Sequence, residues 1–188
     1  MLNLLRAIRL TLVLGVLLGL VYPLVVTGIG QLLFPYQANG SMLVYGGRVV
    51  GSELIAQTTT DPGLFWPRPS AVHYAANGSG GSNLGPTNPA LVKEVTTNLV
   101  FADLPPGTPA SVVPTDMVES SASGLDPDIS LADAGLQIPR IAQRTGLSQK
   151  ELQLLVSRAA IGPFLGLWGQ PMVNVLQLNL ALQRKLGK

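Results

Sequence analysis

The feature that most constrains this 188-residue chain is a long charge-free stretch near its start. Between Arg9 and Arg48 there is no Asp, Glu, Lys or Arg, and residues 10–34 are almost wholly apolar. A helix rising about 1.5 Å per residue over this segment exceeds the roughly 30 Å hydrocarbon core of a bilayer. A core helix of a soluble protein would carry a polar face, which is missing here before Gln31. The segment therefore predicts one transmembrane helix.

Basic residues flank only one end of this segment. Arg6 and Arg9 precede it, and the next basic residue is Arg48. The positive-inside bias predicts a cytoplasmic N-terminus at residues 1–9, a transmembrane helix at 10–34 and an extracytoplasmic domain at 35–188. A cleaved signal peptide would have a shorter apolar region followed by a small-residue cleavage site. We therefore expect an uncleaved, single-pass anchor.

Small residues and one proline interrupt the large side chains of the anchor: Gly15, Gly19, Pro23 and Gly28. Gly15 and Gly19 form a G-x-x-x-G pattern, which lets two transmembrane helices approach closely. Pro23 removes one backbone hydrogen bond and should kink the helix. Glycine and proline are also generally frequent in such helices, so a contact face and ordinary background both remain open. The anchor has no charged residue that would indicate an ion path.

Composition excludes several classes of function. After residue 9 the chain carries ten basic and ten acidic residues, so it lacks the basic excess of a nucleic-acid-binding domain. The absence of cysteine excludes thiolate zinc sites, disulfide frameworks and cysteine nucleophiles. No nucleic-acid partner, metal or catalytic residue is expected.

The region after residue 35 mixes strand and helix signals. Residues 41–45 and 48–55, joined by Gly46-Gly47, predict a β-hairpin. Residues 112–119 have strand character. Four helices are predicted. The first begins at Asn88-Pro89 and runs to about 103, and the second covers 131–138 up to an interruption at Pro139. The third follows the capping box that starts at Ser148, and the fourth occupies 174–186. Without regular βαβ alternation, the fold class is α+β, in a single mixed domain after the transmembrane helix.

The most distinctive local segment is the glycine-rich loop at residues 79–89, which leads into a helix start. Its members are Ser79, Gly80, Gly81, Ser82, Asn83, Leu84, Gly85, Pro86, Thr87, Asn88 and Pro89. Backbone N–H groups in such a loop can hold a phosphate, but the Walker A pattern would need a lysine after Gly85. A shaped loop or an interface is therefore favoured over phosphate binding.

A second candidate loop lies at residues 123–128: Ser123, Gly124, Leu125, Asp126, Pro127 and Asp128. Two carboxylates two residues apart could bind a hard cation or perform acid–base chemistry, but the remaining ligands of an EF-hand are missing. A turn that positions the next helix is the favoured interpretation. His73 is the chain's one histidine, and no G-x-S-x-G nucleophile elbow accompanies it.

These motifs together resemble the C subunit family of the bacterial Kdp potassium-transporting ATPase. The resemblance rests on the apolar segment from Tyr22 to Pro35, N-G-S at 39–41, G-S-E-L-I at 51–55 and F-W with R-P-S at 65–70. It continues through residues 79–89, 123–130, Q-I-P-R at 137–140 and the tail at 173–179. The match covers almost the whole chain in order. One departure is Asp128, where the family favours histidine.

The resemblance implies a non-catalytic accessory subunit in the bacterial inner membrane, needed for assembly and stability. Its partners would be the potassium-conducting subunit, the ATP-hydrolysing subunit and the lipid bilayer. ATP and K⁺ would belong to the complex and not bind this chain directly. The family is also described as a catalytic chaperone that raises ATP affinity, which a domain outside the membrane could do only indirectly. The alternatives are a membrane-tethered hydrolase or nucleotide-binding protein that uses the glycine-rich loop, and a solute-binding module that hands over K⁺.

Overall fold

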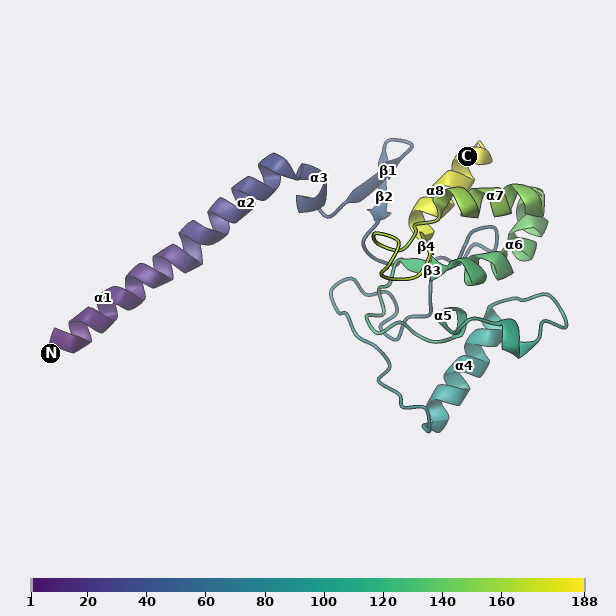
Figure 1. Cartoon of the computed structure of the whole chain (residues 1–188), viewed down its shortest axis with the longest axis horizontal. Helices are drawn as coiled ribbons and strands as arrows, with labels where there is room; N and C mark the ends of the chain where they lie inside the picture. The colour runs from purple at the N-terminus through teal and green to yellow at the C-terminus, as the bar shows by residue number, and fades with distance from the viewer. Residues whose placement is uncertain (1, 188) are drawn as a thin grey trace. The chain divides into compact units, whose positions relative to one another are not determined.

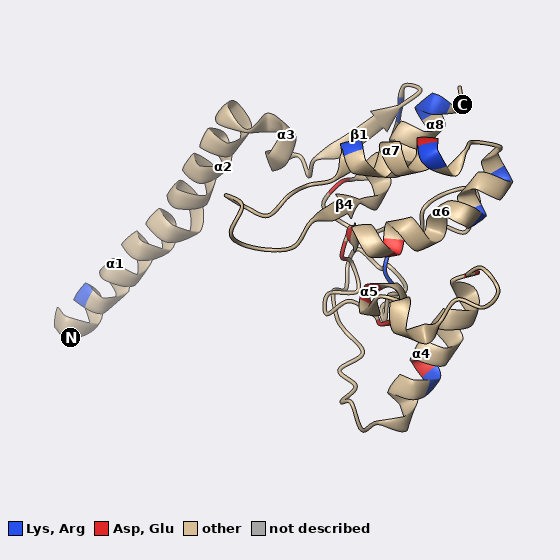
Figure 2. Ribbon diagram, turned by 45° about the vertical axis from the view of Figure 1, so that its right-hand side comes forward, with Lys and Arg blue, Asp and Glu red and all other residues tan. Residues whose placement is uncertain are grey.

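The computed structural model describes residues 2–187, which divide into two compact units between Leu43 and Val44. In the first unit a continuous helix over Leu2–Leu33 is long and apolar enough to cross a membrane, with a mean hydropathy of 2.4 in its most apolar window. It consists of α1 (Leu2–Val16), a π-helical segment η1 (Leu17–Val21) and α2 (Tyr22–Leu33). In this helix the basic residues lie only near the start of α1, and the rest of the helix carries no charge (Figure 2). The predicted anchor is therefore helical, and the helix begins eight residues earlier than position 10.

The π-helical segment lies directly before Pro23. The Tyr22 N–H bonds to the Leu17 carbonyl, five residues back instead of four. A proline inside an α-helix lacks an N–H, and its ring collides with the carbonyl four residues earlier, here that of Gly19. Widening the preceding turn relieves that collision, because a π-turn displaces this carbonyl. The irregularity expected at Pro23 thus takes the form of a π-turn.

The helix ends at a backbone change in Phe34, whose φ of −134° and ψ of 53° are not helical. A short helix α3 (Pro35–Ala38) follows, and the Asn39 side chain donates to the Pro35 carbonyl at 2.6 Å. The Asn39 amide also donates to Gln31 Oε1 at 3.1 Å. The Asn39 side chain thus ties the end of α3 back to its first residue and to the last turns of α2.

The second unit mixes small sheets with helices, as the α+β prediction expected (Figure 1). Strands β1 (Met42–Tyr45) and β2 (Arg48–Ser52) form the predicted hairpin, although β2 ends three residues before position 55. Both turn residues have positive φ, 57° at Gly46 and 77° at Gly47, which is the type I′ geometry that favours glycine. The sequence missed the second sheet, in which β3 (Asp128–Ser130) pairs antiparallel with β4 (Met172–Asn174).

Five helices and one 3₁₀ turn complete the described part of this unit. They are α4 (Pro89–Phe101), η2 (Ala110–Val112), α5 (Thr115–Val118), α6 (Leu131–Thr145), α7 (Gln149–Ala159) and α8 (Val175–Lys185). The predicted starts are confirmed: Asn88, Ser130, Ser148 and Asn174 each cap a helix through a side-chain oxygen. Ser148 and Glu151 form the reciprocal capping box.

Two hydrophobic clusters hold the unit together. The larger lies where α6, α7 and α8 gather at one end of the domain (Figure 1) and includes Phe65, Ile141, Leu152 and Leu178, each fully buried. The smaller joins α4 and α5 around Ala102, Met117 and Val118. The irregular segment before α4 supplies Phe65 to the larger cluster, so this loop is part of the core.

Two predicted elements are wrong. Residues 112–119 are not a strand but the end of η2 followed by α5. Pro114 stands immediately before α5 and has no N–H to donate to a neighbouring strand. Helix α6 is not interrupted at Pro139 but continues to Thr145. The lost hydrogen bond is the one that residue 139 would donate to the carbonyl of Gly135, four positions earlier. Burial of Ile138 and Ile141, on either side of the proline, offsets this loss.

Replacing Phe65 with alanine should destabilise the domain strongly. The side chain is 0% exposed in the larger cluster, so its loss leaves a cavity and costs about 3–5 kcal/mol. Urea unfolding of the full chain in mild detergent, followed by far-UV circular dichroism, measures the change. The matched control is Phe164→Ala, where the side chain is 71% exposed and the change should stay within about 0.5 kcal/mol. Equal effects at the two positions would contradict the assigned core.

Candidate functional site

The structure brings the two predicted loops together. The Gly80 N–H donates to the Ser123 carbonyl at 2.8 Å, and the Ser79 hydroxyl donates to the same carbonyl at 3.0 Å. Ser70 reaches the neighbouring residue, donating its hydroxyl to the Gly124 carbonyl at 2.7 Å. Residues 79–81 and 121–124, called here the loop seam, therefore lie side by side although about forty positions separate them in sequence.

Two glycines make this close approach possible. Gly124 has a φ of +66°, and a Cβ atom there would lie 2.7 Å from the Gly80 carbonyl oxygen. A Cβ atom on Gly81 would lie 3.0 Å from the Ala122 carbonyl oxygen. Any side chain at Gly124 would therefore be strained and would collide with backbone, so the seam requires glycine at this position.

A hollow of about 250 Å³ opens beside the loop seam. Its lining is Gly81, Ser82, Asn83, Leu84 and Leu91 on one side and Glu119, Ser120, Ser121 and Ala122 on the other. The lining holds no basic side chain. The first helical N–H groups of α4 are used internally, by Ala90 to Asn88 Oδ1 at 2.9 Å and by Leu91 to the Asn88 carbonyl at 3.0 Å. The geometry thus favours the shaped-loop interpretation over a phosphate cradle.

The rest of the first loop is a turn exposed to solvent. Gly85, Pro86, Thr87 and Asn88 are all exposed, and the Asn88 N–H closes the turn onto the Gly85 carbonyl at 2.9 Å. Pro89 is the first residue of α4. This exposed turn and the hollow are one continuous feature of the chain, fixed at one end by the loop seam and at the other by a capped helix.

The second loop is tied into the domain by its backbone and by its carboxylates. Leu125 is buried and its carbonyl accepts from the Ala56 N–H, while the Pro127 carbonyl accepts from the Val175 N–H. Asp126 pairs with Arg68 at 3.0 Å and also accepts from the Asp128 N–H. The bonds to Ala56, Val175 and Arg68 join the loop to distant segments of the domain, while the bond to the Asp128 N–H shapes the turn itself.

Asp128 is the first residue of β3 and accepts from Asn174 at 3.2 Å. Burial raises the pKa of the Asp128 carboxyl, with a smaller opposing effect from Asn174 and a further rise from Asp126. Within residues 2–187, no cluster of three or more His, Asp or Glu side chains could hold a metal ion. His73 is exposed, with a φ of +53°. Both carboxylates are engaged by neighbouring groups of the domain, Asp126 by Arg68 and Asp128 by Asn174.

The three glycines predicted as helix contacts face open space. A Cβ atom on Gly15, Gly19 or Gly28 would meet nothing within 4 Å in the structure. Gly19 lies in the π-helical segment, and Pro23 is the second residue of α2. The π-turn changes the angular spacing of residues across it, so Gly15 and Gly28 are not related by regular α-helical periodicity. Whether these positions meet another helix stays a prediction.

Sequence reasoning missed a polar network that fixes Phe65 and Trp66. Gln137 accepts from the Trp66 N–H at 2.8 Å and donates to its carbonyl at 3.1 Å. Asn179 does the same for Phe65, with both bonds at 2.8 Å. Two side-chain amides therefore pair with this backbone as a neighbouring strand would.

Arg140 completes this network. Its guanidinium lies 3.7 Å from the ring centroid of Trp66, bonds to Gln137 Oε1 at 2.7 Å and donates to the carbonyls of Pro62 and Leu64. Burial lowers the pKa of Arg140 to about 10, so the group is charged at neutral pH. The cation thus holds the turn before Phe65 as well as the indole ring.

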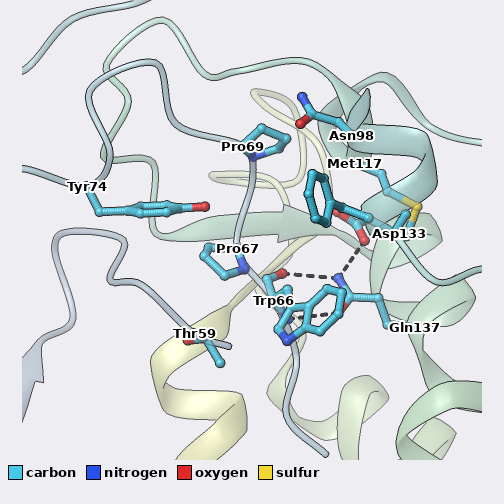
Figure 3. Close-up of a pocket in the computed structure, with 11 residues that line it drawn as sticks. Thr59, Trp66, Pro67, Pro69, Tyr74, Asn98, Met117, Asp133 and Gln137 are labelled. Carbon is cyan, nitrogen blue, oxygen red and sulfur yellow. Dashed lines mark hydrogen bonds between the residues drawn. The ribbon is translucent and has the colours of Figure 1, made fainter. Parts of the chain in front are cut away.

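A cavity of about 190 Å³ adjoins this network (Figure 3). Asp133 and Gln137 form one wall and Tyr74 points in from the opposite side (Figure 3), while Asn98, Phe101 and Met117 come from α4 and α5. Asp133 is 1% exposed and accepts from Gln137 at 2.7 Å. Burial raises the pKa of Asp133 to about 7, against smaller lowering effects of Gln137 and Arg140.

The signal for this network was present in α6. Asp133, Gln137 and Arg140 follow the i, i+4, i+7 spacing of one helix face, next to the apolar Ala134, Ile138 and Ile141. All six residues are buried, so the buried face of α6 is half polar. Buried polar groups need partners, and a polar stripe beside an apolar one indicates a backbone segment packed against the helix.

Comparisons with known proteins agree with one another. The family described as "KdpC: K+-transporting ATPase, c chain" matches residues 4–184. The chain is 51% identical to the potassium-transporting ATPase KdpC subunit of Caldanaerobacter subterraneus, over 97% of this chain and 95% of the relative. It is 51% identical to that of Polaromonas naphthalenivorans, over 96% and 94%, and 53% identical to that of Variovorax paradoxus, over 90% and 89%.

Asp133→Asn should change how stability depends on pH. Because the carboxyl pKa is about 7 in the folded chain and 3.8 when unperturbed, the folded state binds the extra proton between these values. Stability contributed by the protonated carboxyl is therefore present below about pH 4 and lost as pH rises toward 7. When the pH rises from 5 to 8, the free energy of unfolding of the asparagine variant should increase relative to that of the wild type by on the order of 2–3 kcal/mol.

Urea unfolding of both full-length proteins in mild detergent at the two pH values measures this gain. Comparing variant with wild type removes the contributions of other titrating groups, including Asp128, whose raised pKa acts in the same direction. A difference in unfolding free energy that is the same at pH 5 and pH 8 would contradict a buried, proton-binding Asp133.

Proposed function

Because the chain belongs to the KdpC family of K⁺-transporting ATPase c chains, we propose that it helps to assemble the pump through a preformed loop surface. The chain is a subunit of the potassium-transporting ATPase, an accessory one and not the catalytic one. The hydrolase alternative drawn from the sequence is therefore wrong. Within residues 2–187, one helix is long and apolar enough to cross a membrane, which fits a subunit of a membrane transporter.

The proposed topology is N-terminus inside and domain outside. Arg6 and Arg9 lie at the start of the helix, and no basic residue follows until Arg48. This asymmetry supports a cytoplasmic N-terminus and an extracytoplasmic domain in the bacterial inner membrane. The helix extends from Leu2, so the arginines are on its first turns, where their side chains can reach the headgroups.

The observation that carries the proposal is the loop seam. Backbone hydrogen bonds from Gly80 to Ser123, and glycines that permit close approach, hold an otherwise irregular loop in one conformation. A surface that is already ordered loses little conformational entropy when it binds. The exposed turn at Pro86 and Thr87, with the hollow beside it, is therefore suited to recognise a partner subunit.

The proposed partners are the potassium-conducting and ATP-hydrolysing subunits, and ATP and K⁺ are then ligands of those chains. A domain outside the membrane cannot touch a nucleotide held in the cytoplasm. An effect on ATP affinity must therefore act by stabilising one conformation of the partner over another. In this sense the chain would serve as a catalytic chaperone, raising ATP affinity indirectly.

Thr87→Lys should weaken assembly without unfolding the domain. Thr87 is exposed at the proposed contact, so a lysine is tolerated in water but is buried unpaired when a partner covers it. Such a charge should lower the yield of co-purified partner subunits on the order of tenfold, equivalent to about 1.4 kcal/mol. Affinity purification from mild detergent, with K⁺-stimulated ATPase activity and its KM for ATP, gives the readout.

The matched control is Gln153→Lys, which adds the same charge at an exposed position on α7. It should retain wild-type assembly. If Thr87→Lys co-purifies with partner subunits as well as the wild type does, or if both variants lose the same yield, the loop surface is not the contact. Membership of the family would not be affected by either result.

Single cysteines should report the topology directly, because the chain has no cysteine of its own. Gln143→Cys, at an exposed position on α6, should react with a membrane-impermeant maleimide in intact spheroplasts. Asn3→Cys should react only after lysis, since the positive-inside bias places it in the cytoplasm. The reverse labelling pattern would contradict the proposed orientation and the indirect route to ATP affinity.

A further inference from the structure

An apolar hairpin-like loop connects α7 to β4. Ile161 and Met172 exchange backbone hydrogen bonds of 2.8 and 3.0 Å, and Phe164 and Trp168 exchange bonds of 2.7 and 3.1 Å nearer the tip. Leu165 and Gly166 form the turn, with φ of +51° and +72°. We call residues 161–172 the tip loop.

Large apolar side chains of the tip loop lie in solvent. Their exposed fractions are 71% for Phe164, 73% for Leu165, 75% for Leu167 and 61% for Trp168. The tip loop lies in a stretch with no Asp, Glu, Lys or Arg from Ala159 to Gln183, and Figure 2 draws the connection between α7 and β4 in tan. Apolar surface gathered in this way is costly in water and marks a contact with a membrane or a protein.

Four backbone N–H groups of the tip donate to carbonyls within the loop. Besides the paired Phe164 and Trp168, the Gly166 N–H donates to the Pro163 carbonyl at 2.9 Å and the Leu167 N–H to the Phe164 carbonyl at 3.1 Å. A backbone group without a partner costs several kcal/mol in an apolar medium. Internal bonding lowers the cost of moving this tip out of water.

The side chains of the tip distinguish lipid from protein as the occupant. From 161 to 169 the sequence is I-G-P-F-L-G-L-W-G, in which the Trp168 indole N–H is the one polar side-chain group. A protein interface carries about one hydrogen bond per 100–200 Å², which this side-chain set cannot supply. Tryptophan with Phe and Leu is the composition found at the membrane interface, where the indole N–H meets the headgroups.

A bilayer is within reach of the domain by chain length alone. The membrane helix ends at Leu33 and the second unit begins at Val44. The intervening ten residues span at most about 35 Å when fully extended. Such a short tether gives a high effective concentration of lipid at the domain surface. We propose that the tip loop inserts its apolar side chains into the interfacial layer of the bilayer that holds the chain's own helix.

A spin label on Leu167→Cys tests the proposal, since the chain offers no competing cysteine. The full-length protein is reconstituted into phosphatidylethanolamine and phosphatidylglycerol liposomes, alone and with its partner subunits. Collision rates with oxygen, which partitions into lipid, are compared with those of a water-soluble nickel chelate. References are Gln153→Cys on the exposed part of α7 and Leu14→Cys on the membrane helix.

We expect the ratio of oxygen to nickel collisions at position 167 to exceed that at 153 and to approach that at 14. Adding Phe164→Ser and Trp168→Ser to the labelled variant should return the ratio to the value at 153, with an unchanged circular dichroism spectrum. If position 167 gives the same ratio as position 153 without the two serine substitutions, the proposal is overturned. Protection from both reagents only when partners are present also overturns it, and assigns the tip loop to a protein contact.

Discussion

The domain depends on two side-chain amides that replace a missing strand. Gln137 from α6 and Asn179 from α8 each pair with both backbone polar groups of one residue, Trp66 and Phe65 respectively. The region between β2 and α4 contains no strand or helix, and its internal backbone hydrogen bonds are those of local turns, so these two clamps supply strand-like pairing at Phe65 and Trp66. Because Phe65 then enters the larger hydrophobic cluster, core packing and loop position depend on the same contacts.

Further polar contacts connect the segment around Trp66 with the two candidate loops. Arg140 bonds to Gln137 and stacks on Trp66, and Arg68, two residues farther along the same strand-like segment, pairs with Asp126. Asp126 lies in the second candidate loop, whose Ser123 carbonyl receives the bonds from Gly80 and Ser79. Side-chain contacts and short stretches of backbone thus link the core to the loop seam. The proposed partner surface is rigid because its support begins in the buried face of α6.

Elements governed by local chemistry could be predicted from the sequence. The Gly46-Gly47 turn, the caps at Asn88 and Ser130 and the Ser148 capping box depend on neighbouring residues, and each is present. The failures involve distant partners. Strands β3 and β4 are three residues each and pair across more than forty positions, a contact that leaves no periodic pattern. A proline inside a helix predicts an interruption, but at Pro139 the burial of Ile138 and Ile141 keeps the helix continuous.

The candidate site divides in the same way. Both glycine-containing loops could be identified from composition, but not their pairing, because a Gly124 carbonyl that meets Ser70 and a Ser123 carbonyl that meets Gly80 carry no signature in sequence. The buried Asp133 was missed since an acidic residue three positions after Ser130 is typical of the first turn of any helix, exposed or not. Its continuation as a stripe with Gln137 and Arg140, next to the apolar face of α6, distinguishes it.

Indirect action on ATP carries a thermodynamic consequence for this accessory subunit. If its binding outside the membrane raises the nucleotide affinity of a partner, then nucleotide must tighten the binding of this chain by the same factor. Such coupling requires the loop surface to bind one partner conformation better than another. A loop held by backbone bonds at the seam can discriminate in this way, because it cannot deform to follow the partner. A flexible loop of the same composition would adapt to both conformations more readily and would discriminate less between them.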